Sequence, residues 1–167
     1  MKKKSKSVAL AGMLAALAVV ILFLGSLFEL LDLSASAMAS LVIMVALIEL
    51  GKRWACGVYA VAAVLSLLLF PRTASITFAA FVGYYPVLKV YLDRIKPRVL
   101  QYFVKLLLFN ALLFGVTRVL EHLLTAESDW LTIGWWLGNL TFLVFDFALV
   151  KLSVFYLVKI KNRIRRS

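Results

Sequence analysis

Long apolar runs alternate with short polar clusters along the whole chain. The first run, from Val8 to Phe28, has 21 residues without a charge, enough for a helix to cross a hydrocarbon layer of about 30 Å. The runs are continuous and not alternating in polarity, which argues against a β-barrel, and backbone groups in lipid then require helices. The pattern predicts an all-α integral membrane bundle of six transmembrane helices, at about 8–28, 33–48, 54–70, 73–91, 99–116 and 130–157.

The polar clusters between these runs predict the orientation. Six crossings place the N-terminal tail, the connections after spans two and four and the C-terminal tail on one side. That side carries fifteen basic residues and the other side carries two, Arg72 and Arg118. Because basic residues accumulate on the cytoplasmic side, both termini are expected to be cytoplasmic. The fifteen are Lys2, Lys3, Lys4, Lys6, Lys52, Arg53, Lys89, Arg94, Lys96, Arg98, Lys159, Lys161, Arg163, Arg165 and Arg166.

Composition agrees with a membrane protein of one domain. The chain of 167 residues is 64% hydrophobic and 16% charged, with a mean hydropathy of +1.00, whereas soluble domains are about half apolar and a quarter charged. The net charge of +11 lies in the clusters between spans, where topology and anionic lipid explain it better than nucleic-acid binding. The N-terminal segment is basic like a signal peptide, but its apolar part is too long, so it is expected to remain as the first helix.

Residue constellations for catalysis are absent from the sequence. The single histidine, His122, stands beside Glu121 without a second ligand nearby, and no glycine-rich phosphate loop or serine–histidine–acid set occurs. The lone Cys56 cannot form an intramolecular disulfide. The sequence therefore predicts no enzyme activity, no metal site and no cofactor.

Polar residues inside predicted spans are costly, and Lys105, Asn110 and Asp146 are the candidates for a role there. Lys105 in span five and Asp146 in span six fall at a similar depth on the cytoplasmic side, so an ion pair between them is a hypothesis. The alternative for Lys105 is extension of its ammonium to the headgroups. Asn110, in the middle of span five, needs a hydrogen-bond partner.

Small residues recur at helical spacing. Ala11 and Ala15 form such a pair in span one, beside Gly12 and Ala16. This spacing lets helix backbones approach closely. The pair either packs within the protein or forms a docking surface for another membrane subunit.

Aromatic residues gather at the outer end of span six, as Trp130, Trp135 and Trp136, with Asn139 one turn further in. They are explained either by an interfacial aromatic belt or by a pocket for a flat ligand, oriented by Asn139 and Thr141 and charged by Arg72 or Arg118. In span four, Gly83-Tyr84-Tyr85-Pro86 predicts a kink.

Six helices, a basic N-terminal tail and the motif Ala11-Gly12-Met13-Leu14-Ala15 make the chain resemble the S component, or substrate-capture subunit, of an energy-coupling factor transporter. The resemblance implies a bacterial cell membrane protein that binds a small micronutrient on its outer face. It also implies that Ala11 and Ala15 contact a transmembrane coupling subunit, which two ATPase subunits drive.

Substrate capture for uptake of a vitamin-like molecule is therefore the expected function. Two alternatives stay open, a non-transporting scaffold of the cell-shape or division machinery and a small enzyme of lipid metabolism. The ligand itself has no signature in the sequence.

Overall fold

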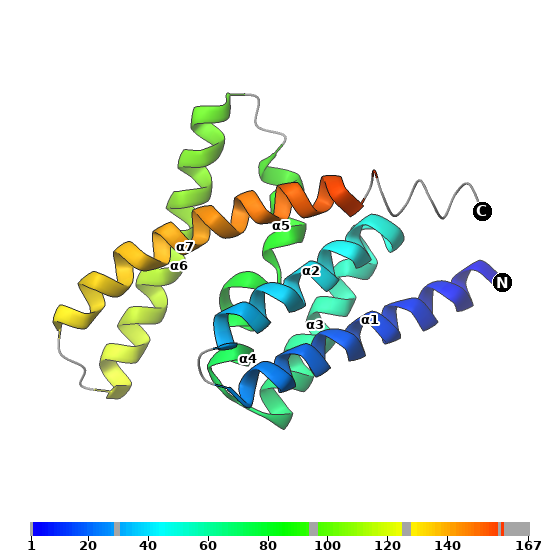
Figure 1. Ribbon diagram of the computed structural model, residues 1–167, viewed down its shortest axis with the longest axis horizontal. Helices are drawn as coiled ribbons and strands as arrows, with labels where there is room; N and C mark the ends of the chain where they lie inside the picture. The colour runs from blue at the N-terminus through cyan, green and yellow to red at the C-terminus, as the bar shows by residue number, and fades with distance from the viewer. Residues whose placement is uncertain (1, 29–30, 94–96, 125–127, 157, 159–167) are drawn as a thin grey trace. The chain divides into compact units, whose positions relative to one another are not determined.

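Helices form all the regular secondary structure of the described residues, which in this computed structural model are 2–28, 31–93, 97–124, 128–156 and 158. Within these ranges, the side chains of residues 2–4, 98–99, 116–124 and 128–135 are not described. The elements, shown in Figure 1, are α1 (Lys2–Ser26), α2 (Asp32–Leu50), α3 (Lys52–Leu69), α4 (Thr73–Thr77), the π-helical turn η2 (Phe78–Val82), α5 (Tyr85–Leu92), α6 (Arg98–Leu124) and α7 (Ser128–Phe155).

Five stretches of helix in the described part of the chain are long and apolar enough to cross a membrane. Among the described side chains of α6, the apolar segment Leu100–Gly115 is shorter than this, so the fifth of the six predicted spans stays a prediction. The five are Ser5–Ser26, Asp32–Leu50, Lys52–Leu69, Thr73–Leu92 and Trp136–Phe155.

The loop predicted from Arg118 to Asp129 is mostly helical, which corrects that prediction. Helix α6 continues to Leu124, and α7 begins at Ser128. The segment from Arg118 to Leu124 contains no glycine or proline. Its glutamate, leucine and arginine residues all favour helix. Polarity was therefore a poor guide to where this helix ends.

A single glycine joins α2 to α3. Gly51 has φ 89° and ψ 175°, a backbone conformation that is open almost only to glycine. Its N–H donates to the Leu47 carbonyl at 3.2 Å, and its own carbonyl accepts from Ala55 at 3.0 Å. Gly51 is therefore the only residue between the end of α2 at Leu50 and the start of α3 at Lys52.

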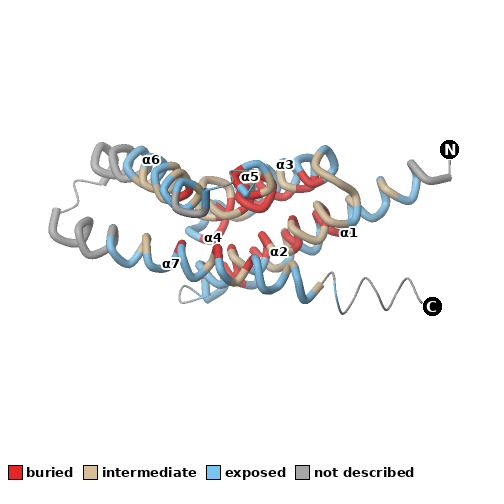
Figure 2. Tube along the Cα trace, turned by 90° about the horizontal axis from the view of Figure 1, so that it is seen from above, coloured by how far each residue is buried: buried red, intermediate tan, exposed pale blue. Residues whose placement is uncertain are grey.

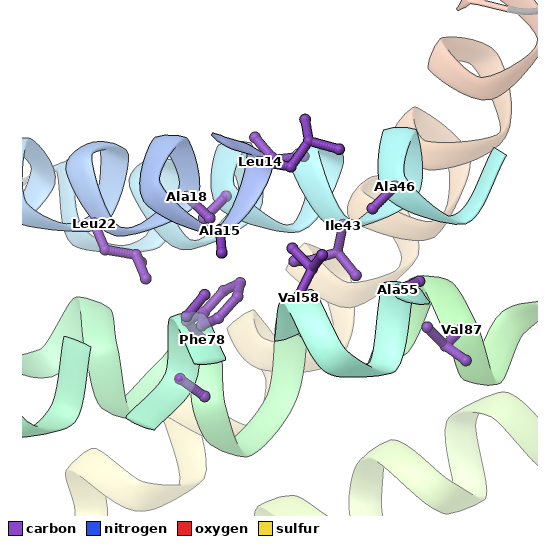
Figure 3. Packing of buried hydrophobic residues seen from close by; sticks show 14 of the residues in the cluster. Leu14, Ala15, Ala18, Leu22, Ile43, Ala46, Ala55, Val58, Phe78 and Val87 are labelled. Carbon is purple, nitrogen blue, oxygen red and sulfur yellow. The ribbon is translucent and has the colours of Figure 1, made fainter. Parts of the chain in front are cut away.

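The chain divides into two compact units, residues 1–91 and 92–167. The first unit packs around small side chains. Figure 3 shows its centre, where Ala15 of α1 and Phe78 of η2 point toward each other. Small residues allow close helix contacts, and six alanines in this unit are fully buried: Ala18, Ala39, Ala46, Ala55, Ala62 and Ala74.

Helices α1 and α2 approach each other closely at Gly25. A Cβ placed on Gly25 would lie 2.0 Å from the Ala35 Cβ, so no larger residue fits without separating the two helices. Ala35 and the next small residue at helical spacing, Ala39, are both buried. Small-residue spacing in α2 therefore serves packing within the first unit.

The fourth apolar stretch is broken, as the sequence predicts. The helix ends at Val82, and Pro86 lies in the first turn of α5, where its missing N–H is tolerated. Ahead of the break the helix widens into η2, in which the Gly83 N–H donates to the Phe78 carbonyl at 2.8 Å, five residues back. The Tyr59 hydroxyl donates to the Ala79 carbonyl at 2.7 Å, and a Cβ on Gly83 would lie 2.7 Å from the Tyr59 ring.

The outer surfaces of the helices are apolar. Figure 2 shows exposed residues along much of α7, and large apolar side chains such as Val144 and Phe147 are more than half exposed there. The first unit likewise exposes Met13 and Leu68. Apolar surface of this extent is typical of helices that face lipid.

Candidate functional site

A buried lysine joins two carboxylates in the second unit. Lys105 lies two turns into α6 and is 4% exposed. Its Nζ is 3.2 Å from Asp146 Oδ2 on α7 and 2.8 Å from Asp93 Oδ1. The ion pair between Lys105 and Asp146 that the sequence predicted is thus present, and the ammonium is turned into the helix hairpin.

Asp93 is the member of this network that sequence reasoning missed. It belongs to the polar connection between α5 and α6, which reads as a solvated turn. In the structure its Oδ1 also accepts from the Gln101 amide, on the first turn of α6. Among the described residues, Lys105 thus meets two carboxylates, and Asp93, whose side chain is 41% exposed, is the one nearer to solvent.

A pair of asparagines forms a second polar contact between α6 and α7. The Asn110 amide donates to Asn139 Oδ1 at 2.8 Å, and the Asn139 amide donates back to Asn110 Oδ1 at 3.1 Å. Asn110 thereby gains the partner that the sequence required. The Phe109 and Phe142 rings stack at 4.5 Å beside them, so amide hydrogen bonds and ring packing fix the register of the two helices.

The tryptophan pocket predicted from the sequence stays a prediction. Trp136 is 77% exposed, which is typical of a side chain at a membrane rim. The side chains of Trp130 and Trp135 lie outside the described residues, as do those of Arg118 and His122. Arg72 is exposed in the connection between α3 and α4, and Asn139 points to Asn110 across the hairpin.

The small pair of α1 packs inside the first unit. Ala15 is 4% exposed and Ala11 is half-buried against the same core. Their neighbours Gly12 and Ala16 are exposed, with nothing within 4 Å of a Cβ placed on Gly12. The docking role that the resemblance implies for Ala11 and Ala15 stays a prediction. The small residues exposed on these turns are Gly12 and Ala16, with Met13 and Leu17 exposed beside them.

One further carboxylate is buried in the first unit. Asp32, the first residue of α2, is 8% exposed, and its Oδ1 has no hydrogen-bond partner among the described residues. The sequence places it in a short turn beside Glu29, where a carboxylate is expected to be solvated. Its burial depends on tertiary packing of α1 and α4 around the start of α2.

These arrangements hold charge and amide groups between helices, which suits ion pairing and ligand recognition. Among the residues whose side chains are described, no three His, Cys, Asp or Glu side chains lie close enough to hold a metal ion. Comparisons with protein-family models, with curated proteins and with solved structures give no match. Fold and site together define an all-helical chain compatible with a multi-pass membrane protein.

Proposed function

We propose that the chain is the substrate-binding membrane subunit of an uptake system for a small, vitamin-like micronutrient, energised by partner ATPases. It crosses the bacterial cell membrane six times with both termini in the cytoplasm, and α6 supplies the fifth crossing. The observation that carries the proposal is the buried polar network of α6 and α7. Intramembrane ionisable residues lower stability and generally mark the path or the site of a ligand.

The polar groups of the second unit fit recognition of a ligand more closely than bond chemistry. The pair formed by Asn110 and Asn139 presents donors and acceptors that a ligand's polar group can replace. The aromatic Trp130, Trp135 and Trp136 are proposed to bind the ligand from the second unit, and the cationic Arg72 is proposed separately as a ligand-binding residue of the first unit. Release inside then requires that the ligand bind differently in two conformations of the chain.

Docking to a coupling subunit is proposed for the exposed face of α1 around Gly12 and Ala16. Small side chains there let a second helix approach the backbone closely. The neighbouring Ala11 and Ala15, which the resemblance implicates, keep α1 straight against its own core while the exposed pair meets the partner.

Ala16→Trp is the direct test of docking. We expect the amount of ATPase that co-purifies with the full chain to fall roughly tenfold or more, equivalent to about 1.4 kcal/mol or more of binding free energy, because the indole separates the helices. The matched control is Leu68→Trp on α3, whose native side chain is 76% exposed. Ala15→Trp is unsuitable because it would disrupt the core.

Equal ATPase recovery from wild type and Ala16→Trp would contradict docking at this face. Mass spectrometry of the gently purified chain tests the ligand-binding part of the proposal, because a capture subunit should retain a small molecule. Recovery of wall-synthesis or cytoskeletal proteins with no ligand would support a scaffold instead.

Cysteine labelling tests the topology. In a Cys56→Ala background, a membrane-impermeant maleimide applied to intact cells should label Glu127→Cys and leave Arg163→Cys unlabelled until the membrane is opened. Cys56, the single native cysteine, is removed so that each variant carries one cysteine and the labelling reports on that position alone. Labelling of Arg163→Cys in intact cells would overturn the cytoplasmic placement of the C-terminal tail and the docking proposal with it.

A further inference from the structure

Asp32 is a buried carboxylate that the network of the second unit does not explain. Its Oδ1 is shielded and has no hydrogen-bond partner among the described residues. A carboxylate oxygen in dry surroundings is costly unless a cation or a donor reaches it. Asp32 also lies in the first turn of α2, where the aligned peptide dipoles favour a negative charge. The fold thus leaves one oxygen of a buried carboxylate without a partner among the described residues.

Three hydroxyl groups on α1, α2 and α4, elements that pack against one another, already donate their protons to backbone carbonyls. The Ser36 hydroxyl lies 2.8 Å from both the Asp32 and the Ala74 carbonyl oxygens, so its one proton is already engaged. The Ser26 hydroxyl donates to the Phe23 carbonyl at 2.7 Å, and Ser75 donates to Phe70 at 3.0 Å. All three hydroxyl oxygens keep lone pairs that can accept a further hydrogen bond.

No described basic side chain of the first unit pairs with the Asp32 carboxylate. Arg72 is the basic residue nearest to this end in the sequence, because it directly precedes α4. Its side chain is exposed and makes no ion pair with Asp32 within the described residues. The other described basic side chains of the unit, such as Lys6 and Lys52, belong to the opposite ends of their helices.

We propose that Asp32 binds the ammonium group of a small organic cation where α1, α2 and α4 meet. An ammonium is a compact cation with several N–H donors and no acceptor, which complements a carboxylate beside hydroxyl oxygens. A divalent metal suits the place less well, because calcium takes six to eight oxygen ligands and the described residues near Asp32 supply a single carboxylate. This inference rests on the proposed function and narrows its ligand to an amine.

The test uses the full chain in lipid nanodiscs with ethylammonium as the probe and ethanol as its uncharged counterpart. Thermal unfolding is followed by tryptophan fluorescence. Ethylammonium should raise the unfolding midpoint of the wild type in a saturable way, and ethanol should not. In Asp32→Asn the apparent affinity for ethylammonium should fall at least about tenfold. Glu49→Gln, on the exposed side of the same helix, should respond like the wild type.

The unfolding midpoint measured without ethylammonium shows whether a variant has lost only binding or has also lost its fold. Asp32→Asn removes a buried charge, so its unfolding midpoint without ethylammonium should equal or exceed that of the wild type. Asp32→Ser serves as a second variant that keeps a favourable residue at the start of α2. No saturable response in the wild type, or an equal response in Asp32→Asn and Asp32→Ser, would overturn the inference.

Mass spectrometry of the same samples distinguishes this inference from the proposed function. A co-purified amine that is retained by the wild type and lost from Asp32→Asn supports both. A co-purified ligand without a basic nitrogen, together with bound ATPases, overturns the inference and leaves the proposed function standing. A chain that recovers neither ligand nor ATPases overturns both.

Discussion

Lys105→Ala is expected to lower the free energy of unfolding by about 3–5 kcal/mol, because it strands a buried carboxylate. Asp146 is 3% exposed and lies 3.2 Å from the Lys105 ammonium, so removal of the lysine takes away a close cationic partner. Equilibrium unfolding in mixed micelles measures the effect. Asp93→Asn is the control within the same network. Because Asp93 is 41% exposed and solvent screens it, its substitution should cost less than about 1 kcal/mol.

The double variant Lys105→Met with Asp146→Leu decides whether the two residues act as a pair. Replacing both charges with apolar side chains of similar size should recover most of the stability that Lys105→Ala loses, since a buried ion pair is often no more stable than an apolar one. Additive losses in the two single variants and the double variant would show that the residues are not coupled.

Phe78→Ala is expected to lower the free energy of unfolding by about 3 kcal/mol, the lower end for a buried phenylalanine. Phe78 is fully buried at the start of η2, and its ring centroid lies 5.9 Å from that of Tyr59. Lipid is as apolar as the protein interior, so the loss comes from packing and not from transfer into water. Unfolding of the chain in bicelles measures it.

The matched control is Phe28→Ala, which removes the same side chain from a site that is 62% exposed. It should change the free energy of unfolding by less than about 0.5 kcal/mol. Equal effects of the two substitutions would mean that Phe78 does not fill the core of the first unit.

Depth along a span can be predicted from the sequence, whereas the path of a connection cannot. Lys105 and Asp146 were paired correctly because each residue of an α-helix adds a fixed rise, which places both at a similar depth. Asp93 was missed because its contact with Lys105 depends on how the connection before α6 folds back. Asn110 was known to need a partner, but Asn139 is selected by the register between α6 and α7, which no local pattern encodes.

The burial of individual residues likewise depends on tertiary packing, which the local sequence pattern does not encode. The pattern around Ala11 and Ala15 revealed that α1 makes a close contact, but not which contact, because small residues suit a core and an interface equally. Asp32 looked like a turn residue, since the packing of α1 and α4 that covers it is tertiary. The break at Pro86 followed from its missing N–H, whereas the π-helical turn ahead of it has no comparable signal.

The π-helical turn determines which residues of the fourth apolar stretch face the core beyond the turn. Four buried positions of this stretch, Ala74, Phe78, Gly83 and Val87, are spaced by four, five and four residues. The step of five coincides with the hydrogen bond from Gly83 to Phe78. An uninterrupted α-helix would turn everything beyond this point by about 100°, moving Val87 off the inward stripe. Deleting one residue from this stretch would therefore rotate its second half about the helix axis. The number of residues matters for the direction in which side chains point as well as for the length of the span.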